Sequence, residues 1–186
     1  KRLALKEHLL LEQGEQPLAG LYQDFSREVV AYFIDQGVLE ITEREVNRAA
    51  AYYEGKEQSQ ALLLNTEQSK AVETVVSQFG KTSNPFLLEG VTGSGKTEVY
   101  LQIIQEVLNK GKTAIMLVPE ISLTPQMTDR FISRFGQEVA ILHSGLSNGE
   151  KYDQWRKVER GEAKVVVGAR SAIFAPLKNI GAIIID

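Results

Sequence analysis

The stretch GVTGSGKT at residues 90–97 decides the fold of this chain. It has the pattern Gly-x-x-x-x-Gly-Lys-Thr, with a short apolar run before it and a run of helical spacing after it. In such a strand–loop–helix unit, glycines let consecutive backbone N–H groups curl around phosphates at the positive end of a helix dipole. The pattern therefore predicts a phosphate-binding loop, and a glycine-rich turn without a ligand fits its context less well.

Different residues of this loop are expected to bind the phosphates of a nucleotide and its Mg²⁺. We expect Lys96 to reach the β- and γ-phosphates and the Thr97 hydroxyl to ligate Mg²⁺. An aspartate that ends a later apolar strand commonly shares this metal, and Asp186 ends the run at 180–186. Lys96, Thr97 and Asp186 are thus the candidate catalytic residues, and Thr97 and Asp186 the candidate Mg²⁺ ligands. The predicted nucleotide-binding residues of the loop are Gly90, Thr92, Gly93, Ser94, Gly95, Lys96 and Thr97.

Strand and helix patterns alternate from residue 61 onward. Candidate strands cover 85–90, 113–119, 138–143, 164–168 and 181–186. Candidate helices cover 66–79, 97–109, 125–135 and 148–160. This alternation predicts an α/β lobe with a parallel sheet covered on both faces, and it places ligands at the carboxyl ends of the strands.

The first 57 residues are predicted to form a separate, mostly helical domain. Three short helical patterns precede an alternating run at 38–46 that is typical of a strand, and this order suggests a winged helix. A polar, glycine-containing segment at 52–59 is the predicted linker, so the lobe covers 58–186. The third helix has more acidic than basic residues at its exposed positions. This charge favours protein contact over DNA reading.

Composition restricts the class of protein. The 186 residues are 43% hydrophobic and 24% charged, as in a soluble globular protein, and no run has membrane-spanning length or the form of a secretion signal. The absence of cysteine excludes disulfides and cysteine-based zinc sites within this stretch and favours the cytoplasm. The net charge is −3, with the acidic excess in residues 1–60. Any nucleic-acid contact therefore needs a local patch in the second part.

Several residues near the strand ends have two interpretations each. Asn65 and Gln68 fit a capping box, but the Gln68 amide also has the donors and acceptor to read an adenine edge. Thr124 fits a helix cap, but such a helix start also suits a nucleic-acid phosphate. Arg170 would pair with a phosphate or form a salt bridge with Glu120.

Several phrases of the sequence closely resemble the bacterial primosomal replication-restart DNA helicases, the PriA (primosomal protein N-prime) family of superfamily 2. They are LNTEQ at 64–68, GVTGSGKTEVYLQ at 90–102, LVPEISLTPQ at 117–126, LHSGLS at 142–147, VVVGARSAIFAP at 165–176 and the terminal IGAIIID. The resemblance spans residues 61–186, and residues 1–57 resemble the family's winged-helix domain more loosely.

This resemblance implies a RecA-like first helicase lobe from an ATP-dependent 3′-to-5′ DNA helicase that restarts stalled replication forks and loads the primosome. By motif, Gln68 is similar to the family's adenine-reading glutamine, and Gly93 to Thr97 to its phosphate and magnesium residues. Asp186 matches the first residue of the family's Asp-Glu-Glu-His (Walker B) box, at which the lobe would be truncated. The residues in motifs that the family places along single-stranded DNA are Glu120, Thr124, Arg170 and Ser171.

The implied cofactors are ATP and Mg²⁺, with zinc expected in a part of the family's proteins outside this sequence. The implied partners are single-stranded and forked DNA and the primosome and other replication proteins, with no membrane, in the bacterial cytoplasm. We expect this chain to bind nucleotide without hydrolysing it, because the other acids of the box and the second motor lobe lie outside it. One alternative is a phosphate-loop switch or kinase unrelated to DNA, which the phrases LVPEISLTPQ and GARSAIF disfavour. Another is a non-catalytic replication scaffold, which the acidic first domain leaves open.

Overall fold

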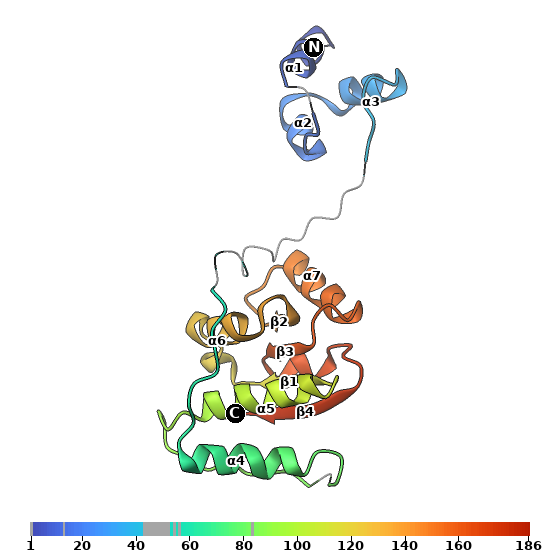
Figure 1. Ribbon diagram of the computed structural model, residues 1–186. Coiled ribbons are helices and arrows are strands. Elements are labelled where there is room, and N and C mark those ends of the chain that lie inside the picture. The colour runs from blue at the N-terminus through green and yellow to red at the C-terminus, as the bar shows by residue number, and fades with distance from the viewer. Residues whose placement is uncertain (1, 13, 43–52, 54, 56, 83) are drawn as a thin grey trace. The chain divides into compact units, whose positions relative to one another are not determined.

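The chain folds into two compact units. A computed structural model describes residues 2–12, 14–42, 53, 55, 57–82 and 84–186. The units comprise Lys1–Val46 and Asn47–Asp186, and each has its own hydrophobic core (Figure 1). The division lies ahead of the predicted boundary between 57 and 58, because Tyr53 already belongs to the core of the second unit.

The first unit contains three helices, as its apolar spacing predicts. They are α1 (Arg2–Leu11), α2 (Leu18–Asp24) and α3 (Arg27–Asp35). Leu5, Leu21, Val30 and Phe33 are buried together, so each helix contributes one apolar side to a small common core. Burial of these side chains, rather than helix propensity, holds such short helices together.

The strand predicted at 38–46 is wrong over the part that the structure describes. Residues 38–42 form no strand, and residues 43–46 lie outside the described residues. The N–H groups of Val38 and Leu39 both donate to the Phe33 carbonyl, at 3.0 and 3.1 Å. These groups therefore close the end of α3 instead of pairing in a ladder, and the winged helix remains a prediction.

The second unit is built on a four-stranded parallel sheet of order β2-β3-β1-β4. The strands are β1 (Thr113–Leu117), β2 (Val139–Leu142), β3 (Val165–Gly168) and β4 (Ile180–Ile185). Four of the five predicted strands are thereby confirmed, and so is the α/β class. Because every strand runs in the same direction, all four carboxyl ends meet at one edge of the sheet.

Alternate residues of β2 and β3 enter two separate cores. Val165 and Val167 face a large cluster that includes residues of α5 (Lys96–Asn109) and α6 (Pro125–Phe135). Val166 faces the other cluster, together with Val158 of α7 (Asn148–Glu159) and Ala172 of η4 (Arg170–Phe174). The side-chain period of two in a strand thus explains why these strands are apolar along their whole length.

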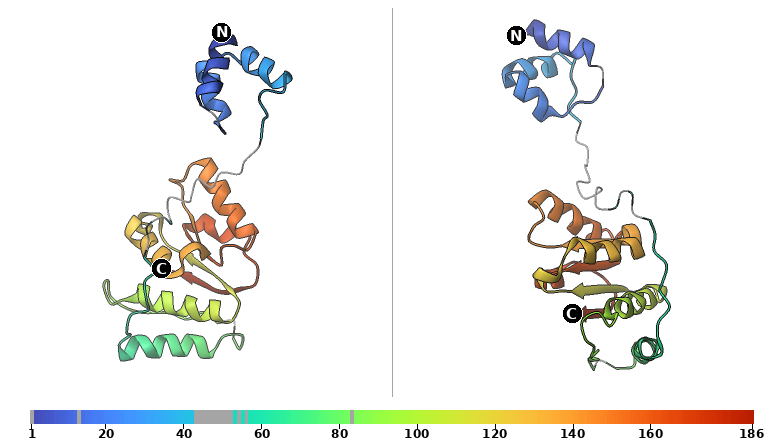
Figure 2. Two further views of the ribbon diagram at one scale, coloured as in Figure 1. Left: turned by 45° about the horizontal axis from the view of Figure 1, so that its top comes forward. Right: turned by 90° about the vertical axis from the view of Figure 1, so that its left-hand side faces the viewer.

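Helices cover both faces of the sheet. Figures 1 and 2 show α4 (Thr66–Ser77) lying beside α5, one layer further from the strands. The remaining short helices are η2 (Glu120–Ser122) and η3 (Gly136–Glu138). The four predicted helices of the lobe are confirmed. Helix α6 comes after β1 in the chain, and α7 comes after β2.

The strand predicted at 85–90 is wrong. Residues 84–90 have no strand pairing among the described residues, and Leu87 is 93% exposed. Only Leu88 of this run packs against the larger core. An apolar run indicates burial but supplies no ladder partner, and here the segment passes as extended chain into the glycine loop.

The outer edge of β2 is closed by side chains. Ile141 donates its backbone N–H to Gln154 Oε1 at 3.1 Å. The Val139 carbonyl accepts from the Tyr53 hydroxyl at 2.7 Å and from Lys157 Nζ at 3.0 Å. Polar groups that an edge strand would offer to another strand are therefore already satisfied.

Lys157 has an unusual environment for a cation. Its ammonium lies 3.8 Å from the centroid of the Tyr53 ring. Burial lowers the pKa of Lys157 to about 8, and the nearby Glu162 carboxylate opposes this shift. The folded chain therefore releases this proton at a lower pH than the unfolded chain does.

We expect the stability of the chain to rise with pH because of Lys157. Between pH 8 and the ordinary lysine value of 10.5, the unfolded state binds more protons at this residue than the folded state. Urea denaturation across this window should show the native chain gaining free energy of unfolding relative to Lys157→Met. Lys70→Met, which removes an exposed lysine, is the matched control. Parallel pH profiles for the native and Lys157→Met chains would contradict the assignment.

Candidate functional site

The glycine loop is folded around its own lysine. Gly93 and Gly95 adopt left-handed φ values of 82° and 84°, and α5 begins directly after them. Lys96 Nζ donates to the carbonyls of Gly90 at 2.7 Å and Val91 at 3.3 Å. The ammonium thus lies inside the loop, where a phosphate oxygen could replace the carbonyl oxygens as its acceptor.

Gln68 joins the start of α4 to this loop. Its Oε1 accepts from the Asn65 N–H at 3.0 Å, and its backbone N–H donates to Asn65 Oδ1 at 2.9 Å. The predicted capping box is therefore confirmed. Gln68 Nε2 also donates to the Ser94 carbonyl at 2.9 Å, so the side chain fixes the loop as well as the cap. Reading of an adenine by this amide remains a prediction, and it would compete with these bonds.

Asp186 lies beside the first turns of α5. Its N–H donates to the Leu117 carbonyl at 3.0 Å, which continues the pairing of β4 with β1. Its Oδ1 accepts from the Tyr100 hydroxyl at 3.0 Å. Tyr100 is buried, and desolvation, together with the hydrogen bond to Asp186 and its charge, raises the tyrosine pKa to about 12. The hydroxyl therefore stays protonated and keeps donating to the carboxylate.

The donor set suits Mg²⁺ better than a transition metal. Thr97 lies one helical turn before Tyr100, so its hydroxyl is on the side of α5 that meets Asp186. Mg²⁺ keeps most of its waters and is held by one or two carboxylates with substrate phosphates. Among the described residues, no group of three or more His, Cys, Asp or Glu could hold a metal. Thr97 and Asp186 have oxygen donors of the kind that Mg²⁺ takes when it arrives with a nucleotide, and their role as its ligands remains a prediction.

A buried ion pair, which the sequence does not reveal, supports this site. Arg134 Nη2 of α6 lies 3.0 Å from both carboxylate oxygens of Glu98 in α5. The same nitrogen donates to the Gln60 carbonyl at 3.1 Å, and Glu98 accepts from the Leu62 N–H at 3.1 Å. The pair therefore holds the segment that leads into Gln68. Its members are 36 residues apart in the sequence, so no local pattern pairs them.

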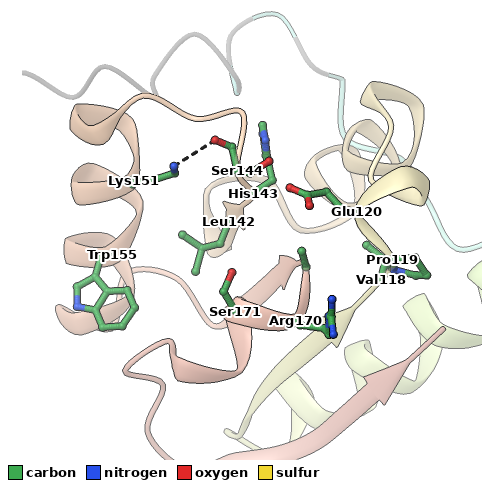
Figure 3. A pocket seen from close by; sticks show the side chains of 11 residues that line it. Val118, Pro119, Glu120, Leu142, His143, Ser144, Lys151, Trp155, Arg170 and Ser171 are labelled. Atoms are coloured by element: carbon green, nitrogen blue, oxygen red, sulfur yellow. Dashed lines mark hydrogen bonds between the residues drawn. The ribbon is translucent and has the colours of Figure 1, made fainter.

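A second site is a cavity at the carboxyl ends of β1, β2 and β3. Its volume is about 640 Å³ (Figure 3). It is lined by Val118, Pro119, Glu120, Leu142, His143, Ser144, Lys151, Trp155, Ala169, Arg170 and Ser171. Three of the four predicted DNA-binding residues, Glu120, Arg170 and Ser171, thus meet in one cavity, which joins segments far apart in the chain.

Thr124 lies outside the lining of this cavity. Its hydroxyl caps α6 by accepting from the Met127 N–H at 3.2 Å, so the predicted cap is confirmed. The hydroxyl oxygen of Thr124 is therefore already engaged as an acceptor by the helix. A contact of Thr124 with DNA remains a prediction.

The cavity carries an ionised acid between cationic groups. A hydrogen bond from the Ser144 side chain holds the pKa of Glu120 below its usual range, although partial desolvation acts against it. The Ser144 backbone and the charges of His143 and Arg170 lower this pKa further, to smaller extents. Arg170 therefore acts on Glu120 through its charge, while Ser144 is the principal hydrogen-bond partner.

Comparison with known proteins shows the family to which the chain belongs. The family described as "Type III restriction enzyme, res subunit" matches residues 61–186. Three curated relatives are each named "Replication restart protein PriA". That of Bacillus subtilis (strain 168) is 50% identical over 185 residues, which cover 96% of this chain and 23% of that protein. Those of Synechocystis (strain PCC 6803) and Treponema pallidum are 49% and 46% identical over 93% and 71% of this chain.

The predicted resemblance to the replication-restart family is thereby confirmed. This chain spans about a fifth of the length of these relatives. None of the helices in the described part of the chain combines the length and apolar character needed to cross a bilayer.

Replacement of Gly95 by alanine should test the link between Gln68 and the loop. An alanine there pays roughly 1–2 kcal/mol for its left-handed backbone. Its Cβ would also lie 2.5 Å from Gln68 Nε2, which must move and lose its bond to Ser94, at a further cost of about 1 kcal/mol. Urea denaturation of Gly95→Ala measures the total loss in the free energy of unfolding.

Gly111→Ala is the matched control, because Gly111 has a φ of 69° and open space around it. We expect Gly95→Ala to lower the free energy of unfolding by more than Gly111→Ala does. The excess should shrink when Gln68 is also changed to alanine. Equal losses for the two single variants would show that Gln68 does not restrain the loop.

Proposed function

Because the chain belongs to the family described as "Type III restriction enzyme, res subunit", we propose that it forms the nucleotide-binding first lobe of an ATP-dependent 3′-to-5′ DNA helicase. Relatives named for replication restart support the further proposal that the whole protein restarts stalled forks and loads the primosome. The observation that carries this is the placement of Asp186 against α5, a helix that begins directly after a glycine loop whose lysine donates to two loop carbonyls. A phosphate-loop switch or kinase unrelated to DNA would not account for these relatives.

ATP is the proposed nucleotide, with its phosphates in the loop from Gly90 to Thr97. In the bound state Lys96 would exchange its contacts with loop carbonyls for contacts with the β- and γ-phosphates. Mg²⁺, held by the Thr97 hydroxyl and Asp186, would neutralise charge on the phosphates. Gln68 would contact the base in exchange for its side-chain bonds to Asn65 and Ser94, while its backbone N–H keeps its bond to Asn65 Oδ1. Zinc in the remainder of the protein stays an expectation from the family.

Single-stranded and forked DNA are the proposed partners of the cavity at the strand ends. Arg170 supplies a planar cation for a phosphate, and Ser171 supplies a hydroxyl and the first turn of η4. Glu120 and Thr124 would lie along the same DNA strand. Relatives that act in replication support primosome and replication proteins as further partners, in the bacterial cytoplasm. The predicted first domain, residues 1–57, is the proposed winged helix.

Lys96→Ala should weaken binding of ADP and ATP. Lys96 supplies the charge-assisted contact to the phosphates, and loss of such a contact costs about 1.5–3 kcal/mol, or tenfold or more in affinity. Isothermal titration calorimetry with Mg²⁺ present measures the effect. Lys81→Ala, an exposed lysine away from the loop, should leave affinity unchanged. Similar affinities for the two variants would refute the role of Lys96.

The isolated chain should bind nucleotide with negligible turnover. It spans about a fifth of the length of its relatives, and phosphoryl transfer needs a group that positions the attacking water and cations around the transferred phosphate. A coupled steady-state ATPase assay, with and without single-stranded DNA, checks this. DNA-stimulated turnover by the purified 186-residue chain would overturn this proposal but leave the nucleotide site intact.

A further inference from the structure

One wall of the cavity at the strand ends comes from α7, which none of the predicted DNA-binding residues occupies. Figure 3 shows Trp155 and Lys151 on this helix, across the cavity from Glu120 and Arg170, with Ser171 between the two sides. The neighbours Gln154 and Val158 are fully buried, whereas Trp155 is 39% exposed. A large indole is therefore held at the margin of the core with part of its surface open to the cavity.

Two cations share the cavity with this indole. Lys151 is four residues before Trp155 on α7, so the two side chains are neighbours on the helix surface. Lys151 Nζ donates to the Ser144 carbonyl at 3.1 Å, which keeps the ammonium at the cavity rim. Arg170 enters from η4 at the end of β3. The aromatic surface thus lines the same cavity as two groups that attract phosphate, one on its own helix and one on the opposite side.

The chemistry of this wall differs from that of the opposite wall. Glu120 is held ionised by Ser144 and repels phosphate at its end of the cavity. Lys151 and Arg170, rather than Glu120, are therefore the groups of this cavity that can contact the phosphates of a DNA strand. A volume of about 640 Å³ lies in the range of pockets that accept a small ligand such as a nucleotide unit. Aromatic stacking surfaces between cations are the usual means of holding single strands without reading sequence.

We propose that Trp155 stacks on an unpaired base of a single DNA strand, while Lys151 and Arg170 contact its phosphates. This proposal rests on the proposed DNA-binding function and adds α7 to the binding surface. Stacking on an indole is available to any base, so the contact gives affinity without sequence preference. A base paired in a duplex offers no free face, so the contact also selects single strands.

The chain provides its own probe, because Trp155 is its single tryptophan. Intrinsic fluorescence should be quenched when an oligothymidylate of about 15 nucleotides is added. Quenching should saturate together with the anisotropy of an end-labelled copy of the same oligonucleotide. An abasic oligonucleotide of equal length keeps the phosphates but has nothing to stack, so it should quench far less at equal occupancy.

Trp155→Leu should weaken single-strand binding about tenfold, and Trp155→Phe should weaken it less, because Phe keeps a ring. Tyr152→Leu is the matched control, since Tyr152 is an exposed aromatic residue of α7 outside the cavity lining. Circular dichroism confirms that each variant is folded. Binding without quenching, or equal affinity for Trp155→Leu and the native chain, would overturn the stacking role and leave the DNA proposal standing. Absence of any anisotropy change for the native chain would overturn both.

Discussion

Parallel pairing of β1 with both β3 and β4 is the constraint on which the rest of the structure depends. It places β1 inside the sheet and aligns three carboxyl ends within one ladder. Asp186 follows β4, Arg170 follows β3 and Glu120 follows β1, so segments far apart in the sequence meet at one edge. The cavity is a product of this alignment, whereas the nucleotide site combines the alignment with the local glycine loop.

Local patterns in the sequence predict most of the lobe correctly. The helices from α4 to α7 and the caps at Asn65 and Thr124 were accessible because spacing and capping chemistry act within a few residues. The strand at 85–90 was predicted wrongly because strand pairing does not depend on local sequence alone. Its apolar composition is a local property, whereas pairing needs a partner that composition does not specify.

The residues that complete the sites escaped prediction because their contacts are long-range. Tyr100 meets Asp186 across 86 residues, and Glu98 meets Arg134 across 36. On a helix pattern these positions look like ordinary members of an apolar or a charged side. The phosphate loop itself was accessible because its glycines encode backbone conformations directly, as the left-handed φ values of Gly93 and Gly95 show.

Because side chains close the outer edge of β2, the edge of the sheet that is left for a further strand is β4. With the outer groups of Val139 and Ile141 satisfied by Tyr53, Lys157 and Gln154, no strand can add on that side without displacing buried polar bonds. The opposite margin is β4, where Ile185 is 75% exposed. A strand that joins this sheet, from the same polypeptide or from another molecule, therefore joins at β4. In concentrated solution, self-association of the chain would begin at that margin, and a solubilising charge would be most effective there.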